Sequence, residues 1–298
     1  MTEPASVAAW RAAGTFVDIG GHAVFVRDTG PHQGSATPLL VFHGFPTSSH
    51  DWHLALPLLA AHRRVVLFDF LGYGLSAKPA DASYSLFEQA DLAIAVCRAV
   101  GLTRCHLIAH DMGTSVACEW MARRERDLLP IEITSLTLSN GSVHIELAQL
   151  TPSQRILRSP LGGFFARNAR FATFKWQLRR ILGKPLPDEE FEAMWHLMTR
   201  DDGRDRVIQI MSYIAERFRF WDRWIGALTR LHDLPVQILW GTEDTVAVPA
   251  IADQLVAEIP EAVDVRLPGL GHYPQVEDAD AFAGAVNSWL DRCEGALP

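Results

Sequence analysis

Apolar residues along the chain follow two alternating patterns. Runs of strand length, four or five residues long and mostly apolar, alternate with stretches in which apolar residues recur at helical spacing. Beyond the N-terminal region the runs are Pro38–Phe42, Val65–Phe68, Cys105–Ala109, Ser135–Ser139, Val236–Trp240 and Val263–Leu267. Such runs are typical of strands buried on both faces of a parallel sheet. Their alternation with helices predicts a mainly parallel, doubly wound α/β sheet.

The remaining elements carry their own start and stop signals. Residues 16–27 form two short strand patterns around a two-glycine turn, which predicts a hairpin and brings the expected strands to eight. Ser85 and Glu88 match a capping box for a helix that reaches about Val100. Further helices are expected at 52–61, 114–126, 250–259 and 279–290.

The alternation stops between residues 141 and 232, where helical and irregular patterns occur without a convincing buried strand. We therefore expect residues 1–140 and 233–298 to form the α/β core. Residues 141–232 would form a helical cap inserted at the carboxyl edge of the sheet, where open α/β sheets bind ligands.

Composition narrows the class of protein. The chain has 298 residues, of which 48% are hydrophobic and 21% charged, so it can bury a large core. A net charge of −8 argues against nucleic acid as the main partner. Four scattered cysteines without a C-x-x-C pair are typical of reduced, buried thiols. With neither a signal-peptide pattern nor an apolar run of about 20 residues, we expect a cytoplasmic protein, monomeric or homodimeric.

The stretch from Cys105 to Ala117 begins as a strand and continues as a helix. At its centre, Asp111 is flanked two residues away on each side by Ala109 and Gly113. A sharp strand-to-helix turn needs small residues at these positions, and it exposes the corner side chain at the edge of the sheet. In a nucleophile elbow that corner residue is often serine, so here the predicted nucleophile is a carboxylate.

Two later loops at the same edge complete a triad. Asp244 follows one late strand and His272 follows the last strand. The order nucleophile, acid, histidine is that of α/β-hydrolase triads, in which His272 would be the base and Asp244 its partner. Glu243 is the adjacent alternative to Asp244. Taken alone, the aspartates could be helix caps and the histidine a solvated loop residue, but the shared order and strand ends favour the triad.

The loop after the first buried strand supplies a further element. It reads His43-Gly44-Phe45-Pro46. The backbone N–H of Phe45 is expected to pair with that of Met112 in a two-donor oxyanion hole. The alternative is a simple turn, but Pro46 stiffens the loop that must aim the Phe45 amide.

These motifs resemble the α/β-hydrolase branch that contains epoxide hydrolases and haloalkane dehalogenases. The resemblance rests on His43-Gly44-Phe45-Pro46, Asp69-x-x-Gly72-x-Gly74-x-Ser76, His110-Asp111-x-Gly113 and Gly271-His272-Tyr273-Pro274, and covers nearly the whole chain outside the cap. A narrower resemblance links the chain to the mesoderm-specific transcript protein-like group. It rests on Ser135–Gly141, Asp202-Gly203, Tyr213-Ile214 and Arg223–Leu228.

The resemblance implies a cofactor-independent hydrolase with an aspartyl alkyl-ester intermediate on Asp111. Epoxide hydrolases of this branch use two cap tyrosines to protonate the ring oxygen. Here Tyr213 matches one, whereas the other region reads Leu161-Gly162-Gly163-Phe164-Phe165 without a tyrosine. Tyr213 would act alone or with His144 or His196, or would be a half-buried helix residue. We expect epoxide hydrolysis to a diol.

Three alternatives remain open. Haloalkane dehalogenases bind halide through side-chain N–H groups, which Met112 and Phe45 lack. An esterase would require a serine nucleophile, and Ser115 is expected to be a packed helix residue instead. A non-catalytic binding protein on the same fold is the third alternative, against which the intact triad argues.

The cap contains a segment of unusual composition. From Leu147 to Pro187 there is no acidic residue, whereas residues 155–184 contain eight basic residues interleaved with aromatic ones. The simplest expectation is a solvated helix face whose aromatic residues lie in the core. The alternative is a patch for a membrane surface or for an apolar organic substrate with an anionic group. No metal is expected, because no histidine pair shows ligand spacing with a cysteine or carboxylate.

Overall fold

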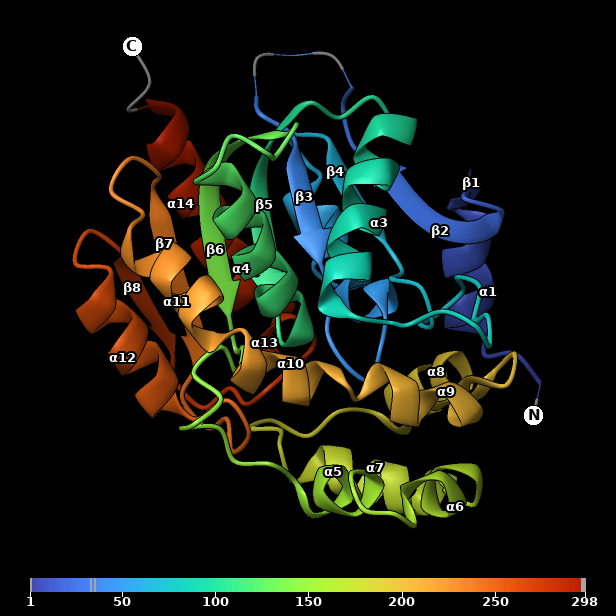
Figure 1. Ribbon diagram of the computed structural model, residues 1–298. Coiled ribbons are helices and arrows are strands. Elements are labelled where there is room, and N and C mark those ends of the chain that lie inside the picture. Colours follow the sequence, from blue (N-terminus) through green and yellow to red (C-terminus); the bar gives the residue numbers. More distant parts are fainter. Residues whose placement is uncertain (1, 33, 35, 296–298) are drawn as a thin grey trace.

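The computed structural model describes residues 2–32, 34 and 36–295. Eight strands form one sheet in the order β1-β2-β4-β3-β5-β6-β7-β8 (Figure 1). The strands are β1 (Thr15–Ile19), β2 (His22–Thr29), β3 (Leu39–Phe42), β4 (Val65–Phe68), β5 (Arg104–His110), β6 (Glu132–Ser139), β7 (Val236–Gly241) and β8 (Val263–Leu267). The pairs β1–β2 and β2–β4 are antiparallel and all others are parallel. The predicted α/β fold with a mainly parallel eight-stranded sheet is confirmed.

Helices cover both faces of the sheet (Figure 1). One apolar layer packs the sheet against α3 (Leu86–Ala99), α4 (Met112–Arg124) and α12 (Pro249–Glu258). A second layer packs the other face against α1 (Ala5–Ala12), α2 (Leu56–Leu59) and α14 (Ala279–Gly295). The central strands β3 and β4 are buried along their whole length, as their apolar sequences require.

The predicted helix at 52–61 is wrong. The chain forms a short 3₁₀ helix η1 (Ser49–Trp52) and then the single turn of α2. Pro57 explains the break, because its ring has no N–H and clashes with the carbonyl four residues earlier, so a helix begun at Trp52 cannot pass through it. Pro57 is instead tolerated in the first turn of α2.

Between β6 and β7 the described chain is helical or irregular. Its helices are α5 (Pro152–Leu157), α6 (Gly162–Arg167), α7 (Phe171–Arg179), α8 (Asp188–Thr199), α9 (Gly203–Ile210), α10 (Tyr213–Arg219) and α11 (Trp221–Thr229). Helices α8–α10 run below the carboxyl ends of the strands, and α5, α6 and α7 form the layer farthest from the sheet (Figure 1). The division into a core and a cap domain at residues 141 and 232 stays a prediction.

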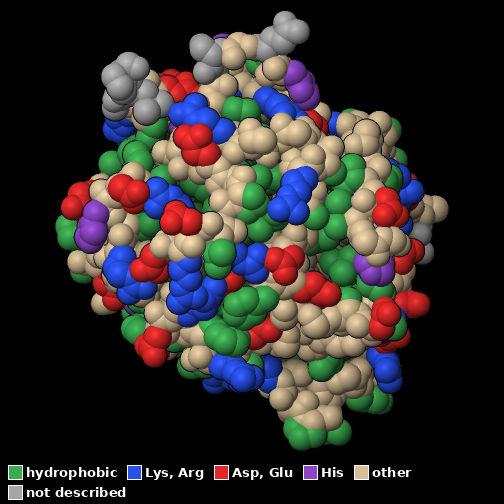
Figure 2. All heavy atoms as spheres, turned by 45° about the horizontal axis from the view of Figure 1, so that its top comes forward, with side chains coloured by type: hydrophobic (Ala, Val, Ile, Leu, Met, Phe, Trp, Pro, Cys, Tyr) green, Lys and Arg blue, Asp and Glu red, His purple; other side chains and the backbone are tan. Residues whose placement is uncertain are grey.

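The surface is mixed in charge on the face that Figure 2 shows, where acidic and basic side chains are interspersed among apolar and neutral ones. None of the helices among the described residues combines the length and the apolar character needed to cross a bilayer. The four cysteines are unpaired and buried.

Candidate active site

Asp111 stands at the corner between β5 and α4 with a positive φ (φ 48°, ψ −114°). Such a conformation is strained for a residue with a side chain, and it persists only when the surroundings enforce it. A Cβ on Gly113 would lie 2.6 Å from the carbonyl oxygen of His43, and one on Gly44 would lie 2.4 Å from the Cβ of Asp111. The predicted elbow therefore exists, and Gly113 in the same turn and Gly44 in the facing loop make room for it.

The Asp111 carboxylate is buried and its two oxygens have different partners. The backbone N–H of Phe45 donates to Oδ1 at 2.7 Å, and Nε2 of His272 lies 3.5 Å from Oδ2. Met112 is the first residue of α4, where backbone N–H groups lack a partner within the helix. No hydrogen bond joins its N–H to the Asp111 side chain among the described residues. Of the two predicted oxyanion donors, Phe45 thus already contacts the carboxylate.

His272 is held from its other side by Asp244. Nδ1 of His272 lies 2.7 Å from Oδ2 of Asp244, and the backbone N–H groups of Val246 and Ala247 donate to Oδ1 at 2.7 and 3.0 Å. The adjacent Glu243 is exposed and does not contact the histidine. Asp111, His272 and Asp244 therefore come together as the sequence predicts, with Asp244 in the position next to the imidazole.

The electrostatics of the three groups are coupled. Burial acts to lower the pKa of His272, but the charges of Asp244 and Asp111 outweigh it and raise that pKa above its usual value. Burial acts to raise the pKa of Asp111, but His272, Arg217 and His110 bring it below its usual value. Both shifts have the same cause, the close contact of the imidazole with the two carboxylates. Converting Asp111 to a neutral ester would remove one of the two negative charges and so lower the pKa of His272, which favours the neutral imidazole that can accept a proton from water.

Tyr213 lies in α10, buried beside the elbow. Its ring packs on Phe45 with centroids 5.6 Å apart, and the Arg217 guanidinium lies 4.7 Å from its centroid. Burial, with a contribution from the Asp111 charge, raises the pKa of Tyr213 well above its usual value, while Arg217 and a hydrogen bond with Gln154 act in the opposite direction. The hydroxyl therefore keeps its proton at neutral pH, as a proton donor must.

The other candidate proton donors, His144 and His196, and the alternative nucleophile Ser115 have other environments. His144 is bonded through both ring nitrogens, to Glu146 and Glu258, each at 2.8 Å. His196 is a partly exposed residue of α8. Neither they nor Tyr213 line the cavity at Asp111, but Tyr213 packs against Phe45, which does. Ser115 accepts a hydrogen bond from Nε of the buried Arg217 at 2.7 Å, in keeping with a packed helix residue.

Sequence reasoning missed three residues that position the site. His43 donates from Nδ1 to the Gly44 carbonyl and accepts at Nε2 from the Phe70 N–H, which ties the Phe45 loop to the loop after β4. His110 bonds through Nε2 to the His272 carbonyl at 2.7 Å. Asn140, with φ 43°, donates to Asp244 at 2.8 Å and to Gly271, and it accepts from Gly241. Each had appeared only as part of a motif, without a role.

Tyr273 was also missed. It follows His272 directly and lines the same cavity, with its ring perpendicular to the imidazole at 5.1 Å between centroids. Burial raises its pKa well above the usual value. Its hydroxyl lies 3.5 Å from Thr47, which in turn donates to the buried Asp51. The signal was its adjacency to the predicted base.

A cavity of about 510 Å³ opens above Asp111. Its floor contains Phe45, Asp111, His272 and Tyr273, and its walls are residues of α5–α9 and neighbouring loops. The wall is mostly apolar, with Gln154, Gln177 and Arg170 among the polar exceptions. A pocket of this size and composition suits a small organic molecule.

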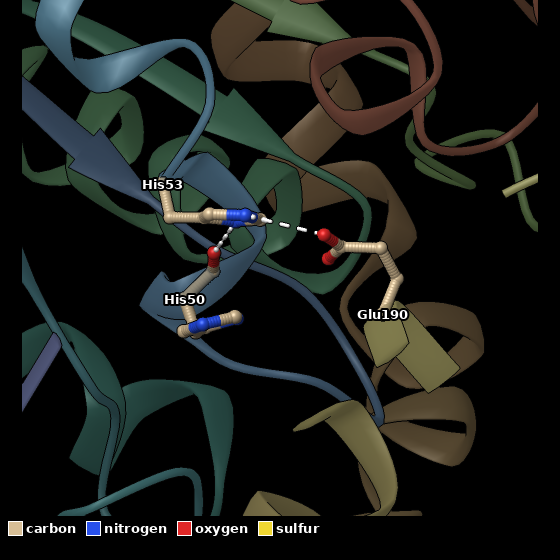
Figure 3. Close-up of side chains that lie close together, drawn as sticks. All are labelled: His50, His53 and Glu190. Carbon is tan, nitrogen blue, oxygen red and sulfur yellow. Dashed lines mark hydrogen bonds and ion pairs between the residues drawn. The ribbon is translucent and has the colours of Figure 1, made fainter. Parts of the chain in front are cut away.

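One group of side chains in the described residues has the donor set for a metal ion: His50, His53 and Glu190 (Figure 3). Nδ1 of His53 bonds to the His50 carbonyl at 3.0 Å, and Nε2 lies 3.2 Å from Glu190. The two imidazoles are stacked, 4.5 Å apart at 18°. In this geometry the group joins η1 to α8, and the expectation of no metal stays a prediction.

Comparison with known proteins identifies the family of the chain. The family model described as the alpha/beta hydrolase fold matches residues 37–279. The chain belongs to the α/β-hydrolase family. It is 41% identical over 292 residues to LipZ of Mycobacterium tuberculosis, which is named as a hydrolase, covering 97% of this chain and 99% of that protein. This membership confirms the prediction of a hydrolase.

Two further similarities concern the predicted branch. The chain is 32% identical to the mesoderm-specific transcript homolog protein of Homo sapiens, covering 94% of this chain and 88% of that protein. The solved structure of a haloalkane dehalogenase loop variant from Bradyrhizobium elkanii superposes with a TM-score of 0.80 at 24% identity, covering 95% and 97% of the two chains. The predicted resemblance to this branch and to the mesoderm-specific transcript group is confirmed.

Proposed function

We propose that the chain is an epoxide hydrolase that works through an aspartyl alkyl ester. The single observation that carries the proposal is the orientation of the Asp111 carboxylate. One carboxylate oxygen accepts the Phe45 N–H at 2.7 Å, and the other faces the imidazole and the cavity. A carboxylate in this place can displace at an sp³ carbon, whereas acyl transfer would need a hydroxyl nucleophile with the hole left free for the substrate carbonyl.

In the first step Oδ2 of Asp111 attacks an epoxide carbon, a C–O ester bond forms and the ring C–O bond breaks. The electron pair leaves on the epoxide oxygen, which takes a proton. Tyr213 is the predicted donor, and Tyr273, whose ring lies against His272 and which lines the cavity, is a second candidate. Both keep their protons at neutral pH because burial raises their pKa values.

In the second step a water molecule gives a proton to His272 and adds to the ester carbonyl of Asp111. The oxyanion forms on the oxygen that already accepts from Phe45, and the N–H of Met112 at the start of α4 is the predicted second donor. Collapse breaks the bond between the carbonyl carbon and the ester oxygen, the departing alkoxide takes the proton of the added hydroxyl, and the diol leaves with Asp111 again a carboxylate. The proton on His272 then returns to the tyrosine.

Haloalkane dehalogenation by the same residues is the second candidate. Phe45 and Met112 lack side-chain N–H groups, but Trp195 of α8 lines the cavity and has one. A single indole would stabilise a leaving halide less well than two donors. This candidate predicts halide release from bromoalkanes at rates that rival diol formation from styrene oxide.

A single turnover in H₂¹⁸O tests the mechanism. With enzyme in excess over styrene oxide, the first diol should carry unlabelled oxygen, and ¹⁸O should appear in the peptide that contains Asp111. The variant His272→Gln should accumulate the ester as a mass increase on the same peptide. Label appearing directly in the first diol would contradict an aspartyl ester. Halide release without diol formation would favour the dehalogenase.

A further inference from the structure

The outer layer of the cap, α5–α7, collects exposed apolar side chains. Eleven large hydrophobic residues of the described chain are exposed, and five of them lie in this short segment. They are Ile156 (42%), Leu161 (63%), Phe164 (66%), Phe165 (45%) and Trp176 (53%). The expectation that the aromatic residues of this segment lie in the core is therefore wrong for Phe164, Phe165 and Trp176. Clustered exposed apolar residues indicate an interaction site.

The same layer is positively charged in an otherwise acidic protein. Residues 155–184 contain eight basic residues, and four of them form ion pairs with acids from outside this segment. These pairs are Arg167 with Asp205, Lys175 and Arg179 with Asp188, and Lys184 with Asp278. The other four, Arg155, Arg158, Arg170 and Arg180, are exposed and have no acidic partner among the described residues. Since the whole chain carries −8, this layer is distinct in sign from the rest.

The apolar patch is continuous with the cavity above Asp111. Ile156 and Phe165 are exposed on the cap and also line that cavity, and so does the exposed Arg170. The wall of the substrate site and the outer surface therefore share side chains. This shared wall makes the surface of α5–α7 the candidate entrance for a molecule that leaves an apolar phase.

We propose that α5–α7 dock on the surface of an anionic lipid bilayer and that an apolar substrate enters the cavity from that bilayer. The docking face consists of Ile156, Leu161, Phe164, Phe165 and Trp176 with Arg155, Arg158, Arg170 and Arg180. Aromatic residues beside arginines are the composition that binds at the interface of membranes with anionic lipids. Docking itself needs no catalysis, whereas the identity of the substrate as a membrane-dissolved epoxide rests on the proposed function.

Sedimentation with vesicles tests the docking. The full chain should bind phosphatidylcholine vesicles that contain a quarter phosphatidylglycerol, should bind pure phosphatidylcholine far less, and should be released by high salt. Phe164→Ser should weaken binding about tenfold or more, because it removes a large apolar contact with the interface. Leu128→Ser is the matched control, since Leu128 is also 66% exposed but follows α4 at the opposite edge of the sheet.

Charge is tested in the same way. Arg155→Gln together with Arg158→Gln should weaken binding by about fivefold for each arginine removed. Arg98→Gln with Arg126→Gln removes two exposed arginines that likewise lack an acidic partner, and it should leave binding unchanged. Equal binding to neutral and anionic vesicles, or equal losses in the control variants, would overturn the proposal. A dimer that forms through this face would also overturn the proposal. It would be recognised if the unchanged chain were dimeric and did not bind vesicles, while Phe164→Ser were monomeric.

The failure of docking and the failure of the proposed reaction are separable. Asp111→Asn should bind vesicles like the unchanged chain, and Phe164→Ser should still turn over a water-soluble epoxide, since Phe164 does not line the cavity. Vesicle binding without epoxide turnover would remove the reaction and keep the docking face. Turnover of soluble epoxides without vesicle binding would remove only the docking face.

Discussion

The edge of the sheet and the outer layer of the cap bound the same cavity but are built differently. At the sheet edge His43, His110 and Asn140 are at most 1% exposed, and each is bonded to a loop that carries the site. In the outer layer α5 has no buried residue and α6 buries only Gly162 and Ala166. The reacting groups are therefore held by buried, hydrogen-bonded residues, whereas α5 and α6, which line the cavity, have few buried residues.

This difference assigns separate tasks to the two regions. A buried hydrogen-bond network holds a catalytic group within fractions of an ångström, which chemistry requires. Short helices with few buried contacts belong to the low end of local stability, from which lids and binding segments are drawn. Changes at the sheet edge should therefore affect turnover itself, whereas changes in the outer layer should affect which substrates bind.

Gly44→Ala should produce the largest effect of any single substitution. The new Cβ would lie 2.4 Å from the Cβ of Asp111 and 2.7 Å from its Oδ1, so the carboxylate must move away from the Phe45 N–H. A misplacement of about 1 Å costs on the order of 100-fold in rate. We expect kcat for styrene oxide to fall by about that factor with KM little changed. A variant that kept its full kcat would show that the Phe45 contact is not needed.

The two tyrosines compare the regions directly, because Tyr273 belongs to the core and Tyr213 to the cap segment. If both hydroxyls serve the ring oxygen, Tyr213→Phe and Tyr273→Phe should each lower kcat about tenfold, and the double variant about 100-fold or more. Tyr84→Phe is the control, since Tyr84 is buried but its hydroxyl bonds to the Pro79 carbonyl. Pre-steady-state measurement of ester formation should locate the loss in ring opening; a loss confined to ester hydrolysis would contradict the assignment.

Arg217 of α10 connects the segment between β6 and β7 to the strand-to-helix turn at Asp111. It donates to Ser115 Oγ at 2.7 Å and to the Asp111 carbonyl at 3.1 Å, and it is buried. Arg217→Met should lower the free energy of unfolding by about 1–3 kcal/mol, because buried acceptors lose their donor. Chemical denaturation measures this loss. Arg219→Met, on the exposed side of the same helix, should change stability by less than about 0.5 kcal/mol.

Arg217→Met should also shift the acid limb of the pH profile of activity. Arg217 lowers the pKa of Asp111, so its removal raises that pKa. The ionised nucleophile, and the stability that its ionisation contributes, would then be lost at a higher pH as the solution is acidified. A pH profile of kcat/KM that stays identical in Arg217→Met would show that the arginine acts only on packing.

Much of the sheet edge could be predicted from the sequence because its signals are local. Apolar runs define the central strands, and Ala109 and Gly113 around Asp111 define the elbow. The chain order of Asp111, Asp244 and His272 then gives the triad. The supporting residues could not be found in this way, because Asn140 reaches Asp244 and His110 reaches His272 only through the packing of β5 to β8.

The cap was less predictable for a physical reason. The sequence shows that Phe164, Phe165 and Trp176 alternate with arginines, but short helices leave no stable period from which to choose the buried face. Only the placement of α6 against α9 and of α7 against α8 determines which side is covered. Likewise Glu190 of α8 contacts His53, which follows η1, and the sequence has no local spacing that predicts this contact.

The smallest expected effects come from two adjacent glycines of α6, which separate the outer layer from the chemistry. A Cβ on Gly162 would lie 1.9 Å from the Leu157 carbonyl oxygen, whereas one on Gly163 meets nothing within 4 Å. Gly162→Ala should push α6 away from the end of α5 and raise KM several-fold for a bulky epoxide, with kcat for styrene oxide within about twofold. Gly163→Ala should leave both constants unchanged and stabilise the helix by up to about 1 kcal/mol. Since the two substitutions add the same methyl group one residue apart, a fall in kcat for Gly162→Ala alone would mean that the outer layer also positions the nucleophile, and the division of tasks would fail.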